Sequence, residues 1–188
     1  MIVPYYNIDK EFPRIEKSLI NSIKKIGHSG NFILGNNLDI FEKKLQKIIG
    51  SKNIIGVANG TDALELSISA LNIPVGSEII SVSNTFISTI NSILRSGCKP
   101  VLCDIDETFN IDPLKIEKLI TKKTKAIIAV HLNGMPCCMN KINLIARKYK
   151  LKVIEDSAQS VLSEYEGKKI GNSKNISCFS LHPTKNFG

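Results

Sequence analysis

Three short segments of this sequence contain residues that could do chemistry together, and each lies at or just after the end of a short apolar run. Gly60-Thr61 comes after the first such run, Asp156 ends a later one, and Lys185 lies just beyond the last. Backbone N–H groups and a hydroxyl at the start of a helix bind phosphate. A carboxylate at the end of a buried strand needs a partner, and a protonated pyridine nitrogen is one candidate. A lysine amine among buried groups forms Schiff bases with carbonyl compounds.

Each of these residues also has a purely structural interpretation, which is favoured when the residue is taken alone. Thr61 or its neighbour Asp62 could simply cap a helix. Asp156 could form a salt bridge or a helix cap, and Lys185 could be solvated like most lysines. Phe86, which follows another apolar run, could be a core aromatic. The chemical interpretation therefore depends on whether the fold brings these residues together.

The pattern of apolar residues predicts how they are positioned. Asp112 and Pro113 are typical of a helix start. Short apolar runs alternate with stretches of helical spacing, and strands that are apolar throughout are typical of a parallel sheet covered by helices on both faces. Ligands bind at the carboxyl ends of such strands. We therefore expect an α/β fold with a mostly parallel sheet. The expected strands are 53–58, 78–82, 100–104, 125–131, 152–155 and 176–181, and the expected helices between them are 62–71, 88–95, 113–120 and 141–149.

The first part of the chain has a different pattern. Ile15, Leu19 and Ile23 recur at helical spacing before Gly27 and Gly30, which are stop signals. A second helix is expected at 38–49. We interpret 1–35 as an arm and a helix, and 36–188 as a large ligand-binding domain.

Four segments resemble one known family, the DegT/DnrJ/EryC1/StrS aminotransferases, which are sugar-nucleotide enzymes of the fold-type-I pyridoxal-phosphate (PLP) group. They occur in the family's order and at about its spacing, and the match runs from near residue 12 to the end. Each motif alone is weak, but four in register make a chance match very improbable. The segments are Asn59-Gly60-Thr61-Asp62-Ala63-Leu64, Val130-His131-Leu132-Asn133-Gly134, Glu155-Asp156-Ser157-Ala158-Gln159 and Phe179-Ser180-Leu181-His182-Pro183-Thr184-Lys185-Asn186.

The resemblance implies a role for each matching position. Lys185 would carry the cofactor PLP, and Asp156 would pair with its pyridine nitrogen. Gln159, where the family has Gln or His, would contact the phenolic oxygen, and Phe86 would stack on the ring. His131 and His182 match motif positions without an evident role. The remaining implied residues, Gly60, Thr61 and Ser180, would bind the phosphate.

The resemblance also implies an activity and a larger protein. The family transfers an amino group from an amino acid, here expected to be glutamate, to a nucleotide-linked keto sugar for surface polysaccharide or amino-sugar biosynthesis. Its members are homodimers, roughly twice this length, with a C-terminal small domain that we expect to be absent here. Their three-layer α/β/α sandwich has the strand order 3-2-4-5-6-7-1. The seventh strand would lie next to 53–58, so the sheet is expected to be incomplete.

Composition supports an ordinary soluble protein. Apolar residues make up 43% of the 188, charged residues 22%, and the formal net charge is +8. The lysines are scattered, so we expect a solvated surface rather than a nucleic-acid or membrane partner. No signal peptide or bilayer-spanning run is evident, and the five cysteines suit buried, reduced thiols rather than metal ligands. A cytoplasmic location is expected.

Three alternatives remain open. One is a PLP-dependent sugar dehydratase of the same family, but dehydratases replace the lysine with His, so Lys185 argues against this alternative. The second is a truncated or split, inactive chain that needs a partner chain. The third is a nucleotide-binding module, which the missing Gly-rich fingerprint disfavours.

Overall fold

A computed structural model describes residues 8–186, so residues 1–7 of the expected N-terminal arm lie outside the described part. The chain divides into two compact units. The first contains residues 8–48 and 53–56, and the second contains 49–52 and 57–186. Each unit is described by itself.

The first unit is built from two amphipathic helices, as the spacing of its apolar residues predicts. Helix α1 spans Ile8–Ser29 and is followed by Gly30, whose φ of 68° suits a residue without a side chain. Helix α2 spans Asn36–Ile49 and its first turn carries Asp39, an acidic residue that favours a helix start. The backbone N–H of Gly56 donates to the Glu42 carboxylate at 2.6 Å.

The second unit contains a five-stranded parallel sheet, which confirms the expected fold class. Its strands follow one another in the order β2-β1-β3-β4-β7, with every neighbouring pair parallel. This order corresponds to 3-2-4-5-6 in the numbering of the expected strands. The strands are β1 (Glu78–Val82), β2 (Lys99–Cys103), β3 (Thr124–Val130), β4 (Lys152–Asp156) and β7 (Ile176–Cys178).

One expected strand was wrong. Residues 53–58 form no strand, and no strand in the described part of the chain pairs with them. A strand exists only when its N–H and C=O groups pair with a neighbour. Ile55 and Val57 are consequently exposed instead of buried inside a sheet. The apolar pattern there predicts the tendency to form a strand but not the presence of a partner.

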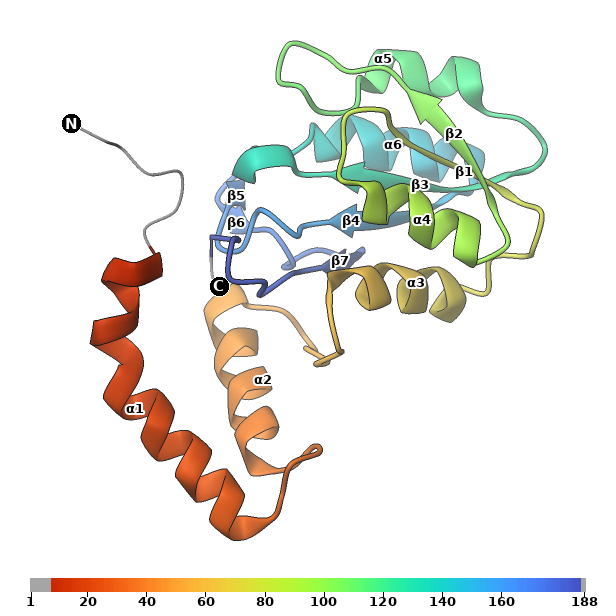
Figure 1. The fold of residues 1–188 in the computed structure, drawn as a ribbon. Coiled ribbons are helices and arrows are strands. Elements are labelled where there is room, and N and C mark those ends of the chain that lie inside the picture. The colour runs from red at the N-terminus through yellow and green to blue at the C-terminus, as the bar shows by residue number, and fades with distance from the viewer. Residues whose placement is uncertain (1–7, 187–188) are drawn as a thin grey trace. The chain divides into compact units, whose positions relative to one another are not determined.

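Helices cover both faces of the sheet, which gives three layers (Figure 1). Helices α3 (Gly60–Ala70) and α4 (Ile87–Arg95) cover one face, and α5 (Pro113–Ile116) and α6 (Met139–Tyr149) cover the other. The helix start at Asp112 is confirmed, because its carboxylate accepts a hydrogen bond from the Leu114 N–H at 2.9 Å. The helix expected at 113–120 is shorter and passes into a 3₁₀ turn, η1 (Glu117–Leu119).

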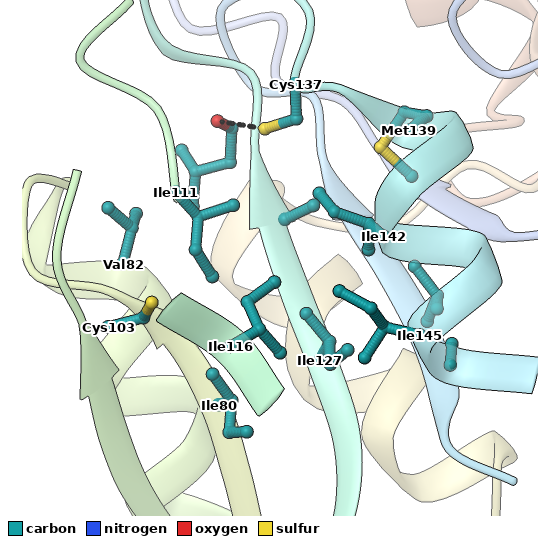
Figure 2. Close-up of a cluster of buried hydrophobic side chains, with 14 residues drawn as sticks. Ile80, Val82, Cys103, Ile111, Ile116, Ile127, Cys137, Met139, Ile142 and Ile145 are labelled. Carbon is teal, nitrogen blue, oxygen red and sulfur yellow. Dashed lines mark hydrogen bonds between the residues drawn. The ribbon is translucent and has the colours of Figure 1, made fainter. Parts of the chain in front are cut away.

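Two apolar clusters hold the layers together. On the α3–α4 face, Ile68 and Ile93 pack against Ile79 and Ile128 of the sheet. On the other face, Ile142 of α6 packs with the residues that Figure 2 labels, including Ile80, Ile116 and Ile127. Burying one such side chain contributes about 1.5–3 kcal/mol. The helices are thereby fixed against the strands whose ends carry the polar residues.

The chain between β4 and β7 contains a small hairpin that the apolar pattern does not predict. Strands β5 (Glu164–Tyr165) and β6 (Lys168–Lys169) pair antiparallel. The two residues between them, Glu166 and Gly167, both have positive φ, as a two-residue hairpin turn requires. The strands are too short and too polar for their alternation to stand out.

No helix within residues 8–186 combines the length and the apolar character that crossing a bilayer requires.

Candidate active site

A cavity of about 340 Å³ opens at the carboxyl edge of the sheet in the second unit. Its walls come from the start of α3, the loop before α4, the ends of β3 and β4, and the segment after β7. The structure therefore brings together residues that lie far apart in the sequence. Every residue that the sequence analysis selected lines this cavity: Gly60, Thr61, Phe86, Asp156, Gln159, Ser180 and Lys185.

The expected phosphate-binding residues meet where α3 begins. Asn59 caps the helix by accepting a hydrogen bond from the Asp62 N–H at 2.9 Å, so Gly60 and Thr61 form the first turn. Their N–H groups have no acceptor inside the helix. A Cβ added at Gly60 would lie 3.2 Å from the Ser180 Cβ, which is closer than most such contacts. Glycine at this position lets the helix start approach the Ser180 hydroxyl.

Asp156 is a buried carboxylate at the end of β4, with 6% of its surface exposed. Oδ2 accepts a hydrogen bond from the Thr89 hydroxyl at 2.7 Å, and Oδ1 accepts one from the Ala158 N–H at 3.2 Å. Both donors are uncharged. Burial raises the pKa of Asp156 above its ordinary value, although these two hydrogen bonds act in the opposite direction. A cationic group in the cavity would complete the environment of this carboxylate.

Gln159 lies three residues beyond Asp156 and is oriented by the chain after β3. Its Oε1 accepts a hydrogen bond from the Asn133 N–H at 2.7 Å. Asn133 has a φ of 52°, in the left-handed region that Asn tolerates better than most residues. Because the carbonyl end of the amide is held in this way, the NH₂ end is the one that could donate to a ligand.

Lys185 and Phe86 lie next to each other at the mouth of the cavity. The Lys185 Nζ is 5.6 Å from the centre of the Phe86 ring. Phe86 is 63% exposed, so it is not the core aromatic that the sequence alone left open. The backbone N–H of Lys185 donates to the carbonyl oxygen of His182 at 2.8 Å, which places the lysine in a turn after β7.

The two histidines of the motifs have structural surroundings that the sequence did not reveal. The His131 Nδ1 accepts a hydrogen bond from the Cys137 N–H at 3.0 Å, so the neutral ring carries its proton on Nε2 and donates it to Glu155, also at 3.0 Å. His131 is fully buried and lines the cavity. His182 accepts at Nδ1 from the backbone N–H of Thr184, which braces the turn that carries Lys185.

Sequence reasoning missed the hydroxyl groups around the start of α4. Thr85 and Ser88 line the cavity, and Thr89 lies beside it with its hydroxyl on Asp156. The Thr61 hydroxyl donates to the Ser88 Oγ at 2.8 Å, which links the first turns of α3 and α4. The one available signal was the spacing of Thr85 and Thr89, which places two hydroxyls four residues apart.

These residues fit PLP. Its phosphate would meet the first turn of α3, Thr61 and Ser180, and its pyridine nitrogen would meet the buried carboxylate of Asp156. The Lys185 amine is a group that can bond to its aldehyde. The raised pKa of Asp156, which burial causes, is the state expected of a carboxylate whose positively charged partner is a ligand.

A mostly parallel sheet with a lysine, a buried aspartate and a helix start on its carboxyl edge defines the large domain of a PLP-dependent transferase. Residues 13–188 match the model of the DegT/DnrJ/EryC1/StrS aminotransferase family. The chain belongs to this family, as the motifs had predicted.

Two curated relatives show what similar proteins do. A dTDP-3-amino-3,6-dideoxy-alpha-D-galactopyranose transaminase of Aneurinibacillus thermoaerophilus is 46% identical over 96% of this chain and 50% of its own. A 3-oxo-glucose-6-phosphate:glutamate aminotransferase of Bacillus subtilis is 38% identical over 99% of this chain and 42% of its own. The chain spans about half the length of the curated relatives that it matches.

Solved structures agree in fold. DesV of S. venezuelae, in complex with a ketimine intermediate, superposes with a TM-score of 0.95 at 32% identity, over 99% of this chain and 50% of its own. NtdA of Bacillus subtilis, with its bound cofactor PMP, superposes with a TM-score of 0.91 at 38% identity, over 99% of this chain and 42% of its own.

Proposed function

We propose that this chain supplies the cofactor-binding part of a PLP-dependent aminotransferase that aminates a nucleotide-linked 3-oxo sugar. The observation that carries the proposal is a single cavity that holds Lys185, the buried Asp156 and the start of α3. A solvated lysine, a surface salt bridge and an ordinary helix cap would not converge in this way. In this proposal, residues 36–188 form the cofactor-binding domain and 1–35 precede it.

When bound, PLP supplies an electron sink that stabilises negative charge on the α-carbon of an amino acid. Lys185 would hold the cofactor covalently, and its amine would be the base that accepts the proton from the donor's α-carbon. Asp156 would pair with the protonated pyridine nitrogen, which would maintain the electron sink. Gln159 would donate from its NH₂ group to the phenolic oxygen, and Phe86 would stack on the ring. Gly60, Thr61 and Ser180 would hold the phosphate.

The names of the relatives support a particular substrate class. Both place the amino or oxo group on carbon 3 of the sugar, and one of them names glutamate as the donor. The more similar of the two names a dTDP-linked sugar, which favours a nucleotide-linked acceptor. We therefore propose glutamate as donor, a role in surface polysaccharide or amino-sugar biosynthesis, a homodimer and a cytoplasmic location. A family dehydratase is disfavoured because Lys185 is present.

The test is to trap the cofactor on the lysine. The intact protein incubated with PLP should turn yellow, and borohydride reduction followed by peptide mapping should find the cofactor on Lys185. Lys185→Ala should abolish the labelling, whereas Lys168→Ala, which removes an exposed lysine of β6, should leave it unchanged. Labelling of another lysine in the wild type would overturn the assignment.

The acceptor is tested separately with glutamate as donor. We expect transfer to a dTDP-linked 3-oxo sugar, with 3-oxo-glucose 6-phosphate and a 4-oxo nucleotide sugar as comparisons. Faster transfer to the sugar phosphate or to the 4-oxo compound would contradict the proposed substrate class without affecting the cofactor site.

A further inference from the structure

A chain of hydroxyl groups approaches Asp156 from the start of α4. Thr89 lies in the first turn of this helix, is completely buried, and its Oγ1 is 2.7 Å from the Asp156 Oδ2. The Thr85 Oγ1 is 2.7 Å from the Thr89 Oγ1. Asp156 and Thr89 are separated by 67 positions, so this contact exists only because α4 packs on the sheet that contains β4.

The direction of these hydrogen bonds follows from the chemistry of the groups. An ionised carboxylate only accepts, so the single hydroxyl proton of Thr89 points to Asp156. The Thr89 oxygen is then free to accept from Thr85, which must donate. The Ala158 N–H, which cannot reverse, holds the other carboxylate oxygen at 3.2 Å. Both oxygens of Asp156 are therefore held by donors that favour its charged form.

We propose that Thr89, supported by Thr85, is a positioning residue that fixes the orientation and the charge of Asp156 for the ring nitrogen of the cofactor. This inference rests on the proposed function, because it assigns Asp156 to that nitrogen. Thr89 touches neither cofactor nor substrate in this scheme and acts through Asp156.

The surroundings of Thr89 favour this role over a purely structural one. The backbone N–H of Thr89 donates to the carbonyl oxygen of Phe86 at 3.1 Å, so this N–H already has a hydrogen-bond partner in the backbone. Its hydroxyl is not needed to cap the helix. A β-branched side chain is also stiff about χ1, so the hydroxyl is held in one direction. A valine would fill the same space without a donor.

The experiment compares two substitutions at one position in the intact protein. Thr89→Val keeps the shape and removes the donor, whereas Thr89→Ser keeps the donor. The first readout uses no cofactor: a ¹³C NMR titration of the Asp156 carboxyl should show its pKa higher in Thr89→Val than in the wild type, because one hydrogen bond to the charged form is lost. Thr89→Ser should titrate like the wild type.

The second readout is the affinity for PLP and the pH at which the visible band of the bound cofactor changes. We expect Thr89→Val to bind PLP about tenfold more weakly, the size expected for one charge-assisted hydrogen bond. The pH of the spectral change should also move, while Thr89→Ser stays within about threefold of wild-type affinity. Thr85→Val should fall between the two, because it removes only the second link.

The outcomes separate the inference from the function on which it rests. If the wild type is labelled at Lys185 and Thr89→Val matches it in both titration and affinity, Thr89 is not a positioning residue and the proposed function stands. If the wild type takes up no PLP, the proposed function fails and this inference fails with it. An equal loss in Thr89→Ser and Thr89→Val would also overturn the inference, since the hydroxyl would then not be what matters.

Discussion

At the scale of single residues, the burial of Asp156 suits the binding of a cationic group but lowers the stability of the protein without cofactor. Its carboxylate is buried, and its pKa is raised because burial disfavours the charge. An acid whose pKa is raised in the folded state holds its proton more tightly there than in the unfolded chain. The protein without cofactor therefore loses stability as the pH rises from the ordinary Asp range through the raised pKa.

Asp156→Asn should accordingly have opposite effects on stability and on turnover. Its NH₂ group can donate to Thr89, which reverses toward Thr85, so the contacts of the side chain with Thr89 and with the Ala158 N–H are both kept. At pH 7 and without cofactor, we expect the variant to melt higher than the wild type, with the difference shrinking toward pH 4. Its turnover should fall at least about a hundredfold, because the pyridine nitrogen loses its counter-ion.

Thermal melts across pH and steady-state rates check both parts of this prediction. Asp104→Asn is the matched control, because Asp104 is an exposed carboxylate that pairs with Lys115 at 2.8 Å. It should leave both quantities nearly unchanged. Near-normal turnover of Asp156→Asn would remove Asp156 from the catalytic residues.

At the scale of elements, the end of β4 is joined to its surroundings through Glu155. One carboxylate oxygen accepts from His131 after β3, and the other accepts from Ser173 and Asn175 at 2.9 and 2.7 Å. A second cavity, of about 510 Å³, is lined by Glu155 and by residues of α6, β5 and β6. Burial alone raises the pKa of Glu155, but the hydrogen bonds from His131, Asn175 and Ser173, together with the electrostatic attraction of His131, outweigh it and leave the pKa below its ordinary value.

Glu155→Gln should destabilise the protein. Both oxygens of Glu155 accept hydrogen bonds, so in either orientation the NH₂ group of the glutamine would face a donor instead of an acceptor. We expect a loss of about 1–3 kcal/mol in the free energy of unfolding at pH 7.

Since the pKa of Glu155 is lowered, the wild type gains stability above the ordinary Glu range and loses it as the pH falls through the lowered pKa. The variant should lack this part of the acid sensitivity. Denaturant melts at several pH values would measure it, with the exposed Glu164→Gln as control. Equal stability of the two variants would contradict this role of Glu155.

The approach of α3 to the segment after β7 depends on a glycine. Gly60→Ala would place a Cβ 3.2 Å from Ser180, so the first turn of α3 must shift by a few tenths of an ångström. We expect affinity for PLP to fall about tenfold, because the phosphate donors move apart. Gly27→Ala in α1 is the control, since no atom lies within 4 Å of its added Cβ and alanine favours helix. Fluorescence titration with PLP decides it, and unchanged affinity of Gly60→Ala would show that the close contact is not required.

At the scale of the whole molecule, the sheet leaves residues 53–58 without a strand partner, and the relatives are about twice as long as this chain. We expect residues 1–188 alone not to transaminate, because an unpaired segment leads directly into the phosphate-binding turn at Gly60. Co-expression with the C-terminal half of a relative should restore turnover. The measurement is turnover and oligomeric state with and without that half. A monomeric 1–188 that transaminates unaided would contradict this expectation.

The features that depend on neighbouring residues could be predicted from the sequence. Alternation of apolar runs and helical spacing predicts the parallel sheet, and the positions of Gly60, Asp156 and Lys185 at or after the ends of apolar runs make them candidate site residues. Asp112 with Pro113 predicts a helix start that the structure confirms. These features follow from local periodicity and from the rule that parallel strands present their carboxyl ends at one edge.

The contacts between distant segments could not be predicted from the sequence and became evident only in the folded chain. The hydrogen bond of Thr89 to Asp156 and that of His131 to Glu155 join residues on different elements. Their existence depends on strand register and helix packing, which no local pattern records. The same reason explains the failure at 53–58, whose apolar residues indicate a strand although pairing requires a neighbour. The sequence gives the type of each side chain, whereas its hydrogen-bond partner on another element is determined only when the helices pack on the sheet.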